Sequence, residues 1–174
     1  MIIRELREDE RSAVLAFFLC LSSMDRYRRF GRPMGDEALR TYVARLDWTD
    51  TVLFGAFASD AALAGLLELA DVRGGAEIAV VVAPQSRGTG LGRAMMDRAL
   101  LKAKVRGHEK VVLLCQMDNQ PMRRLARSAG LEAEVEDAEV EGLLALPRAV
   151  LSDMTEDVTH DTIGNVSYAG LLAT

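Results

Sequence analysis

The feature that most constrains this chain is a glycine-rich turn between an apolar strand pattern and a helical pattern. An apolar run at 78–83 ends at Pro84, the turn covers 85–92, and helical periodicity begins at Leu91. The first amides of a helix lack intrahelical partners, the helix dipole favours an anion there, and glycines let the backbone approach a ligand closely. The segment therefore predicts a site for the pyrophosphate group of a cofactor.

The order of the predicted elements places this turn in an unusual position. Hydrophobic periodicity predicts a strand at 2–6, helices at 10–21 and 36–46, strands at 51–58, 62–70 and 76–83, a helix at 91–106, a strand at 110–116, a helix at 122–129 and a hairpin at 132–140 and 142–146. Residues 21–30 form a loop or helical turn. The order β-α-α-β-β-β-α-β-α-β-β predicts an α+β fold with a mostly antiparallel sheet, and a parallel crossover between the fourth and fifth strands.

This order argues against the common nucleotide-binding loops. A dinucleotide-binding fold places GxGxxG after the first strand of repeated βαβ units, whereas here Gly88-x-Gly90-x-Gly92 follows the fourth strand. The chain also lacks GxxxxGK[ST], the phosphate-binding loop of nucleoside triphosphatases. The turn therefore belongs to another class of pyrophosphate site.

Three segments together resemble the Gcn5-related N-acetyltransferases (GNAT). The residues Gln85-Ser86-Arg87-Gly88-Thr89-Gly90 match the family signature (Q/R)xxGx(G/A). Residues 76–82 look like the fourth strand of that family, and Asn119 with the following helix and Gly130-Leu131 is similar to its next strand–helix unit. The resemblance covers residues 1–147, and residues 21–30 are also similar to the first loop of bacterial protein-lysine acetyltransferase domains. It implies a GNAT-like fold and an acetyl-CoA-dependent N-acetyltransferase.

The resemblance assigns candidate positions for binding acetyl-CoA. Backbone amides of the turn would bind the pyrophosphate, the strand before it would pair with pantetheine, and Asn119 would contact the pantetheine arm. The candidate residues are Val81, Val82, Ala83, Gln85, Arg87, Gly88, Thr89, Gly90, Leu91, Gly92, Arg93 and Asn119. Solvated side chains remain an alternative for Arg87 and Arg93, and a helix N-cap is compatible with Asn119.

The resemblance also points to Glu77 as the candidate general base. The attacking amine must be neutral, so a base or a water chain has to accept its proton. A solvent-facing strand residue or an ion-pair partner is the alternative for Glu77. Many family members carry a tyrosine seven residues after the asparagine as general acid, whereas this chain has Ala126 there. Ser128, Cys115 or a water molecule stays open as its substitute.

The acceptor is less constrained than the donor. The resemblance implies an amine of a small molecule or a protein lysine as acceptor, and places it near residues 24–34 and the second helix. Arg26, Arg28 and Arg29 would suit an acidic substrate, whereas an acidic cleft would suit a polyamine or protein lysine. A solvated basic loop with buried Tyr27 and Phe30 is the alternative. A non-catalytic acyl-CoA-binding domain and a structural module, in which the glycines serve only a tight turn, are the competing functions.

Composition limits the partners. A net charge of −5 and a pI near 5.1 argue against nucleic acid, and the apolar run 14–21 is too short to cross a bilayer. Cys20 and Cys115 are expected to be buried free thiols in a cytoplasmic protein, and no metal site is expected.

Residues 1–147 form the expected acetyltransferase domain. Residues 148–174 form an extension that is read as a tail, an added strand or a dimer contact. The resemblance implies a homodimer, with 166–172 as its candidate contact.

Overall fold

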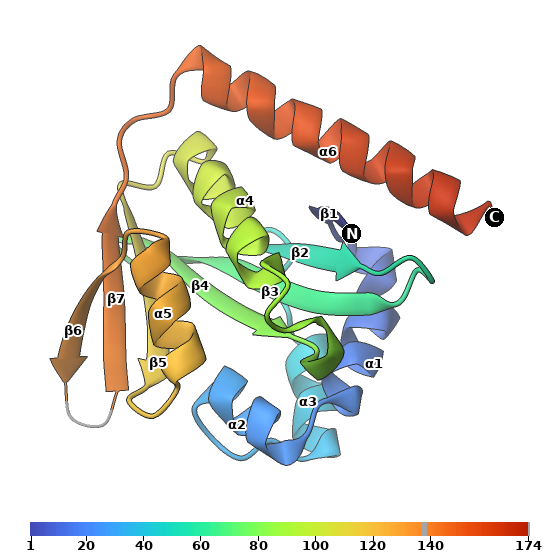
Figure 1. Cartoon of the computed structure of the whole chain (residues 1–174), viewed down its shortest axis with the longest axis horizontal. Helices are drawn as coiled ribbons and strands as arrows, with labels where there is room; N and C mark the ends of the chain where they lie inside the picture. Colours follow the sequence, from blue (N-terminus) through green and yellow to red (C-terminus); the bar gives the residue numbers. More distant parts are fainter. Residues whose placement is uncertain (137–138, 174) are drawn as a thin grey trace.

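Within the residues that the structure describes, seven strands form one mixed sheet in the order β1-β2-β3-β4-β5-β7-β6 (Figure 1). The computed structural model describes residues 1–136 and 139–173, so residues 137 and 138 of the predicted hairpin and Thr174 of the predicted extension lie outside the described residues. The strands are β1 (Ile2–Glu5), β2 (Thr51–Phe57), β3 (Leu63–Val72), β4 (Gly75–Val82), β5 (Lys110–Gln116), β6 (Glu132–Glu136) and β7 (Glu139–Ala145). The helices are α1 (Arg11–Cys20), α2 (Ser23–Phe30), α3 (Asp36–Ala44), α4 (Leu91–Val105), α5 (Gln120–Ser128) and α6 (Leu151–Leu172).

The sheet splits between its fourth and fifth strands. Strands β2, β3 and β4 form the predicted antiparallel meander, and β4 then pairs with β5 in parallel, as the crossover helix predicted. Within the described residues this parallel pairing joins Ala76 to Val111 and Glu77 to Val112 and goes no further. The carboxyl-terminal halves of β4 and β5 therefore separate and leave a gap in the sheet.

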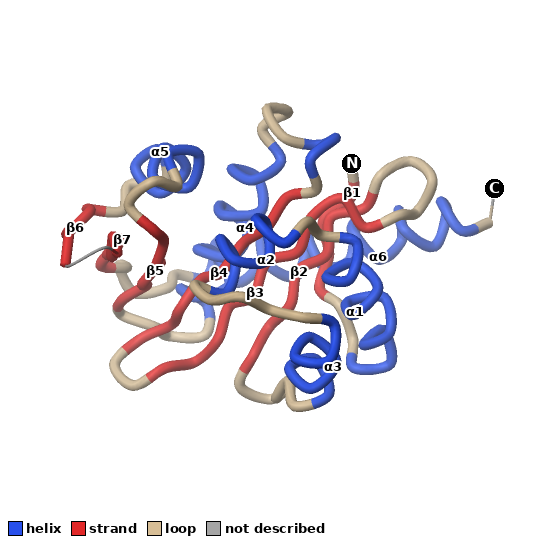
Figure 2. Tube along the Cα trace, turned by 90° about the horizontal axis from the view of Figure 1, so that it is seen from below, coloured by secondary structure: helices blue, strands red, loops and turns tan. Residues whose placement is uncertain are grey.

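The two faces of the sheet carry separate hydrophobic cores, as strand periodicity requires. Phe54, Leu67 and Val80 pack with α4, whereas their sequence neighbours Leu53, Leu66 and Val81 pack with α1 and α3 on the opposite face. Figure 2 shows the strands edge-on with helices on both sides. The gap between β4 and β5 therefore connects the α4 side of the sheet to the side that carries α1, α2 and α3.

Helix α6 follows the last strand of the sheet and packs across α4 and the edge strand β1 (Figure 1). A Cβ atom at Gly164 would lie 2.8 Å from the carbonyl oxygen of Ile3, so the absence of a side chain lets the helix approach β1 closely. Tyr168 packs against Phe57 with ring centroids 4.3 Å apart, and the guanidinium of Arg4 lies over the Tyr168 ring. The extension is thus a docked helix.

The structure confirms the α+β class and corrects several details. The predicted order omitted α2, which begins at the N-cap Ser22, and α6. Strand β7 begins at Glu139, so Glu141, which the prediction placed between the two final strands, lies inside β7. Cys20 is exposed at the end of α1, although Cys115 is buried as expected, and Tyr27 is exposed on α2.

Candidate active site

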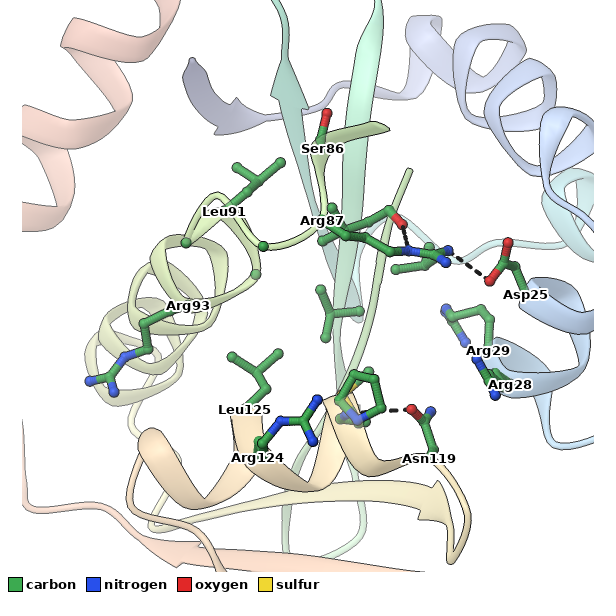
Figure 3. Close-up of a pocket in the computed structure, with 18 residues that line it drawn as sticks. Asp25, Arg28, Arg29, Ser86, Arg87, Leu91, Arg93, Asn119, Arg124 and Leu125 are labelled. Atoms are coloured by element: carbon green, nitrogen blue, oxygen red, sulfur yellow. Dashed lines mark hydrogen bonds and ion pairs between the residues drawn. The ribbon is translucent and has the colours of Figure 1, made fainter. Parts of the chain in front are cut away.

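A cavity of about 460 Å³ lies at the gap between β4 and β5 (Figure 3). Strand β4 contributes Val80, Val81 and Val82 to its wall. The glycine-rich turn and the start of α4 contribute Ser86, Arg87, Gly88, Gly90, Leu91, Gly92 and Arg93, the α5 segment contributes Asn119, Pro121, Met122, Arg124 and Leu125, and α2 contributes Asp25, Arg28 and Arg29. Residues from both faces of the sheet therefore line one cavity.

The turn before α4 has the geometry of an anion site. Gly88 has φ +76° and Gly90 has φ +85°, left-handed conformations in which glycine avoids the penalty of a side chain. Gly90 is the N-cap of α4, and no side chain of a described residue caps this helix end. The first-turn amides are therefore available to a ligand at the positive end of the helix dipole, which fits a pyrophosphate group.

Gly92 permits close packing at the same place. A Cβ atom there would lie 3.4 Å from a methyl group of Leu125 and 3.7 Å from one of Val82. The start of α4 is thus held near both β4 and α5, which sets the width of the cavity.

The two arginines predicted at the turn already have protein partners. Arg87 donates from Nε to the Val82 carbonyl oxygen at 3.0 Å and from Nη2 to Asp25 at 2.7 Å (Figure 3). Arg93 pairs with Asp97 at 2.7 Å and also donates to the Ser128 carbonyl oxygen. Arg87 therefore joins the turn to α2, and both guanidinium groups are oriented by the protein.

The predicted cofactor residues fall into two groups. The cavity brings together Val81, Val82, Arg87, Gly88, Gly90, Leu91, Gly92, Arg93 and Asn119. It does not bring in Ala83, which is buried in the α1–α3 core, Gln85, which is exposed, or Thr89, whose hydroxyl donates to the Ser86 carbonyl oxygen at 2.8 Å.

Asn119 and the helix after it form the wall opposite α2. The Asn119 side chain accepts a hydrogen bond from the Met122 amide at 3.3 Å, so it is the N-cap of α5 as well as a buried cavity residue. Sequence reasoning missed the contributions of Met122, Arg124 and Leu125. The sequence could have indicated them, because Leu125 follows Asn119 by six residues and lies in the helix that was predicted at 122–129.

Helix α2 is fixed beside the cavity by buried polar contacts. Asp25 is 8% exposed, accepts from the Ser22 hydroxyl at 2.8 Å and pairs with Arg87. Arg26 donates to the carbonyl oxygens of Leu19 and Leu21 and pairs with Asp36 at 2.7 Å. Arg26, one of the three arginines considered for an acidic substrate, is thus used to hold the α1–α2 connection.

A buried ion pair lies under α2. Arg29 Nη2 lies 2.6 Å from Glu68 Oε2, and the side chains are each 7% exposed. The Tyr42 hydroxyl donates to the same Glu68 oxygen at 2.5 Å, and burial together with the Glu68 charge raises the pKa of Tyr42 well above its usual value. The network holds Arg29 against the sheet at the cavity wall.

Glu77 lies on the same sheet face as this network. Glu68 is paired with Ala79 and Glu77 with Ala70, so strand alternation places both glutamates on the α1–α3 face. Glu77 is half-buried, lies at the last β4–β5 pair and does not line the cavity. Val80, the nearest cavity residue on the strand, is about 10 Å further along at the usual rise.

No tyrosine stands at the position of the family acid. Ala126 is buried in the core beside α4, and the Ser128 hydroxyl donates to the Leu125 carbonyl oxygen at 2.8 Å. Cys115 is buried at 3% exposure. Of these three, none lines the cavity.

One cluster of carboxylates lies away from the cavity. Glu5, Asp157 and Asp161 are close enough to hold a metal ion, but Arg98 and Lys102 already occupy the space among them. Arg98 is 3% exposed and pairs with both aspartates at 2.5 Å. The cluster is therefore an ion-pair network that attaches α6 to α4.

Comparison with known proteins decides the family. Residues 18–131 match the Acetyltransferase (GNAT) family. The chain belongs to this family. It is accordingly an N-acetyltransferase that uses acetyl-CoA as its acetyl donor. No curated protein matches the chain by sequence, and within the described residues no helix is both long and apolar enough to span a membrane.

Solved structures of acetyltransferases share the fold. The GNAT domain of S. lividans PAT superposes with a TM-score of 0.72 at 19% identity, covering 83% of this chain and 89% of that domain. Spermidine N-acetyltransferase from Vibrio cholerae, in complex with CoA and spermine, gives a TM-score of 0.66 at 19% identity over 82% of this chain and 94% of that one. A dodecameric structure of that enzyme gives 0.60 at 17% identity over 82% and 92%.

Proposed function

We propose that acetyl-CoA binds in the cavity with its pyrophosphate on the amides of residues 87–92 and its pantetheine arm along Val80–Val82. The observation that carries this proposal is the position of an uncapped helix N-terminus at a gap between two parallel strands. Beyond Glu77 the β4 backbone facing β5 has lost its strand partner, so its polar groups are free to pair with the amides of an extended ligand. In the reaction proposed below, protein side chains and water transfer the proton, and no step requires a metal ion.

The reaction is a direct transfer between the thioester and an amine. The neutral amine nitrogen attacks the thioester carbonyl carbon, the C–N bond forms, and the C–S bond breaks to release the thiolate of CoA. Glu77 takes the amine proton through a chain of water molecules, because it lies on the α1–α3 face of the sheet but outside the cavity wall. The thiolate leaves without a tyrosine acid, since Ala126 occupies that position.

Steady-state kinetics with acetyl-CoA and a panel of amines tests this proposal. Glu77→Gln is expected to lower kcat about a hundredfold or more while CoA affinity measured by calorimetry stays unchanged. Glu141→Gln is the matched control, because Glu141 is also a half-buried carboxylate on a strand and lies outside the cavity. Full activity in Glu77→Gln would remove the base assignment, and absence of CoA binding in the wild-type protein would remove the cavity assignment.

The structure also supports a proposal about assembly: a second copy of the chain covers the outer face of α6. This face exposes Val158, Val166 and Leu172, each more than 60% accessible, while the aspartates of the helix face inward. Sedimentation should show a dimer that Val158→Glu with Val166→Glu converts to a monomer, and a monomeric wild-type protein at high micromolar concentration would contradict it. Cys20 and Cys115 form no disulfide in the described part of the chain, which favours a cytoplasmic location.

A further inference from the structure

Among the described residues, buried polar atoms without hydrogen-bond partners occur on the α2 side of the cavity, in the lining residues Arg28 and Arg29, and in Glu68 and Gln116, which lie outside the lining. In the described part of the chain, the Nε atoms of Arg28 and Arg29 are buried without a hydrogen bond, and so is Oε1 of Glu68. Oε1 of Gln116 is in the same state at the end of β5, a strand that α2 contacts. Buried polar groups are normally paired, so their concentration here points to a polar ligand.

The cations of the cavity differ in how they are neutralised. Arg87 pairs with Asp25, Arg93 with Asp97, and Arg29 with Glu68. Among the described residues, no ion pair or hydrogen bond holds the guanidinium groups of Arg28 or Arg124. These two arginines lie on different walls of the cavity, one on α2 and the other on α5.

Arg28 lies on the wall opposite the start of α4 (Figure 3). Figure 3 shows Leu91 and Arg93 of α4 on one side of β4, and Arg28 and Arg29 of α2 on the other. The start of α4 belongs to one face of the sheet and α2 to the opposite face, so the cavity passes through the gap between β4 and β5. A donor whose phosphates lie at α4 therefore presents its thioester toward Arg28.

We propose that Arg28 binds an anionic group of the acceptor, so that the preferred substrate is an amine that also carries a carboxylate or phosphate. This inference rests on the proposed function, because it takes the position of the donor from it. A guanidinium recognises such groups through paired hydrogen bonds and stays charged at all working pH values. The charge of Arg28, which no ion pair among the described residues neutralises, makes this wall unfavourable for a polyamine, whose charge has the same sign.

Matched acceptors test the inference directly. Each amino acid in the panel is offered as the free carboxylate and as its carboxamide, and spermidine represents a polycation. The wild-type enzyme is expected to prefer the carboxylate over the carboxamide at least tenfold in kcat/KM, the effect of about one charge-assisted hydrogen bond. A preference for spermidine or for the carboxamide overturns the inference.

Variants separate the acceptor from the phosphates of the donor. Arg28→Gln should raise KM for the carboxylate at least tenfold and leave both the carboxamide KM and the Kd of CoA unchanged, while Arg28→Lys should restore part of the loss. Arg40→Gln is the control for net charge, because Arg40 is exposed on α3 outside the cavity. A rise in the Kd of CoA in Arg28→Gln would assign the anion to the donor and overturn the inference.

Binding without turnover distinguishes this inference from the proposed function. Calorimetry on the CoA-saturated protein measures the affinity for the same carboxylate and carboxamide pair. Tighter binding of the carboxylate that depends on Arg28 supports the inference, even if no acetyl group is transferred. A lack of acetyl transfer would count against the proposed function alone. Equal binding of the pair overturns the inference while acetyl transfer to other amines leaves the proposed function standing.

Discussion

Replacing Gly90 by alanine should damage acetyl-CoA binding through backbone conformation alone. Gly90 has φ +85°, and a Cβ atom there would meet no neighbouring atom within 4 Å. The substitution therefore introduces no clash, but an L-residue in the left-handed region costs about 1–2 kcal/mol. In a chain of this length that loss corresponds to a fall in Tm of about 2–8 °C.

The loop can relieve this cost by rotating the peptide groups around Gly90, which turns amides at the start of α4 away from the cavity. A lost hydrogen bond to a charged group weakens binding by about tenfold or more. Calorimetric titration with CoA measures this effect, and urea unfolding measures the stability of the same variant. The expected result is a lower unfolding free energy together with a Kd of CoA raised at least tenfold.

Gly74 provides the matched control. It has φ +90° in the β3–β4 turn, its Cβ position is equally empty, and it lies outside the cavity. Gly74→Ala should therefore lose a similar amount of stability and bind CoA with wild-type affinity. The reasoning is refuted if both variants lose stability and both bind CoA as the wild-type protein does.

Three further predictions concern the buried charges. Asp157→Ala should lower the free energy of unfolding by about 3 kcal/mol in urea, because Arg98 and Lys102 lose a partner in a buried network, and an unchanged midpoint would contradict the docking of α6. Burial alone would raise the pKa of Asp157, but Lys102 and Arg98 lower it below its usual 3.8. The network therefore stabilises the fold above about pH 4 and loses this contribution as the pH falls through the pKa of the folded state, so Asp157→Asn should show a flatter acid dependence than the wild-type protein. Glu68→Gln should cost about 3 kcal/mol by leaving Arg29 unpaired, and a loss below about 1 kcal/mol would show that this ion pair is dispensable.

The sequence predicted the fold best where glycine positions and strand periodicity indicate the same element. The meander, the crossover and the turn before α4 were predictable, because positive φ angles require glycine and the apolar period changes from two residues to about four along the chain. The cavity wall was predictable for Val81, Val82 and the turn. The contributions of α2 to the cavity wall depend on how the α1–α2 connection folds back over the sheet. Hydrogen bonds of Arg26 determine this path, and no local sequence pattern predicts them.

Helix α6 was not predicted because it reverses the usual pattern. Its inward positions carry Asp153, Asp157 and Asp161, four residues apart, whereas apolar side chains such as Val158, Ile163 and Val166 are exposed and Tyr168 is the large apolar side chain that packs inward. Hydrophobic periodicity assumes that apolar residues face the core, so it indicates no buried helix here. The acidic spacing becomes meaningful only beside Arg98, Lys102 and Lys104 of α4.

A crystal structure of the chain with CoA tests the central claim most directly. The claim is that the gap between β4 and β5 is the donor site, entered from the start of α4. We predict pyrophosphate oxygens within hydrogen-bond distance of amides in residues 87–92, pantetheine beside Val80–Val82, and the thiol pointing toward α2. CoA bound elsewhere, or in the cavity with its phosphates on Arg28 and Arg29, would contradict the account.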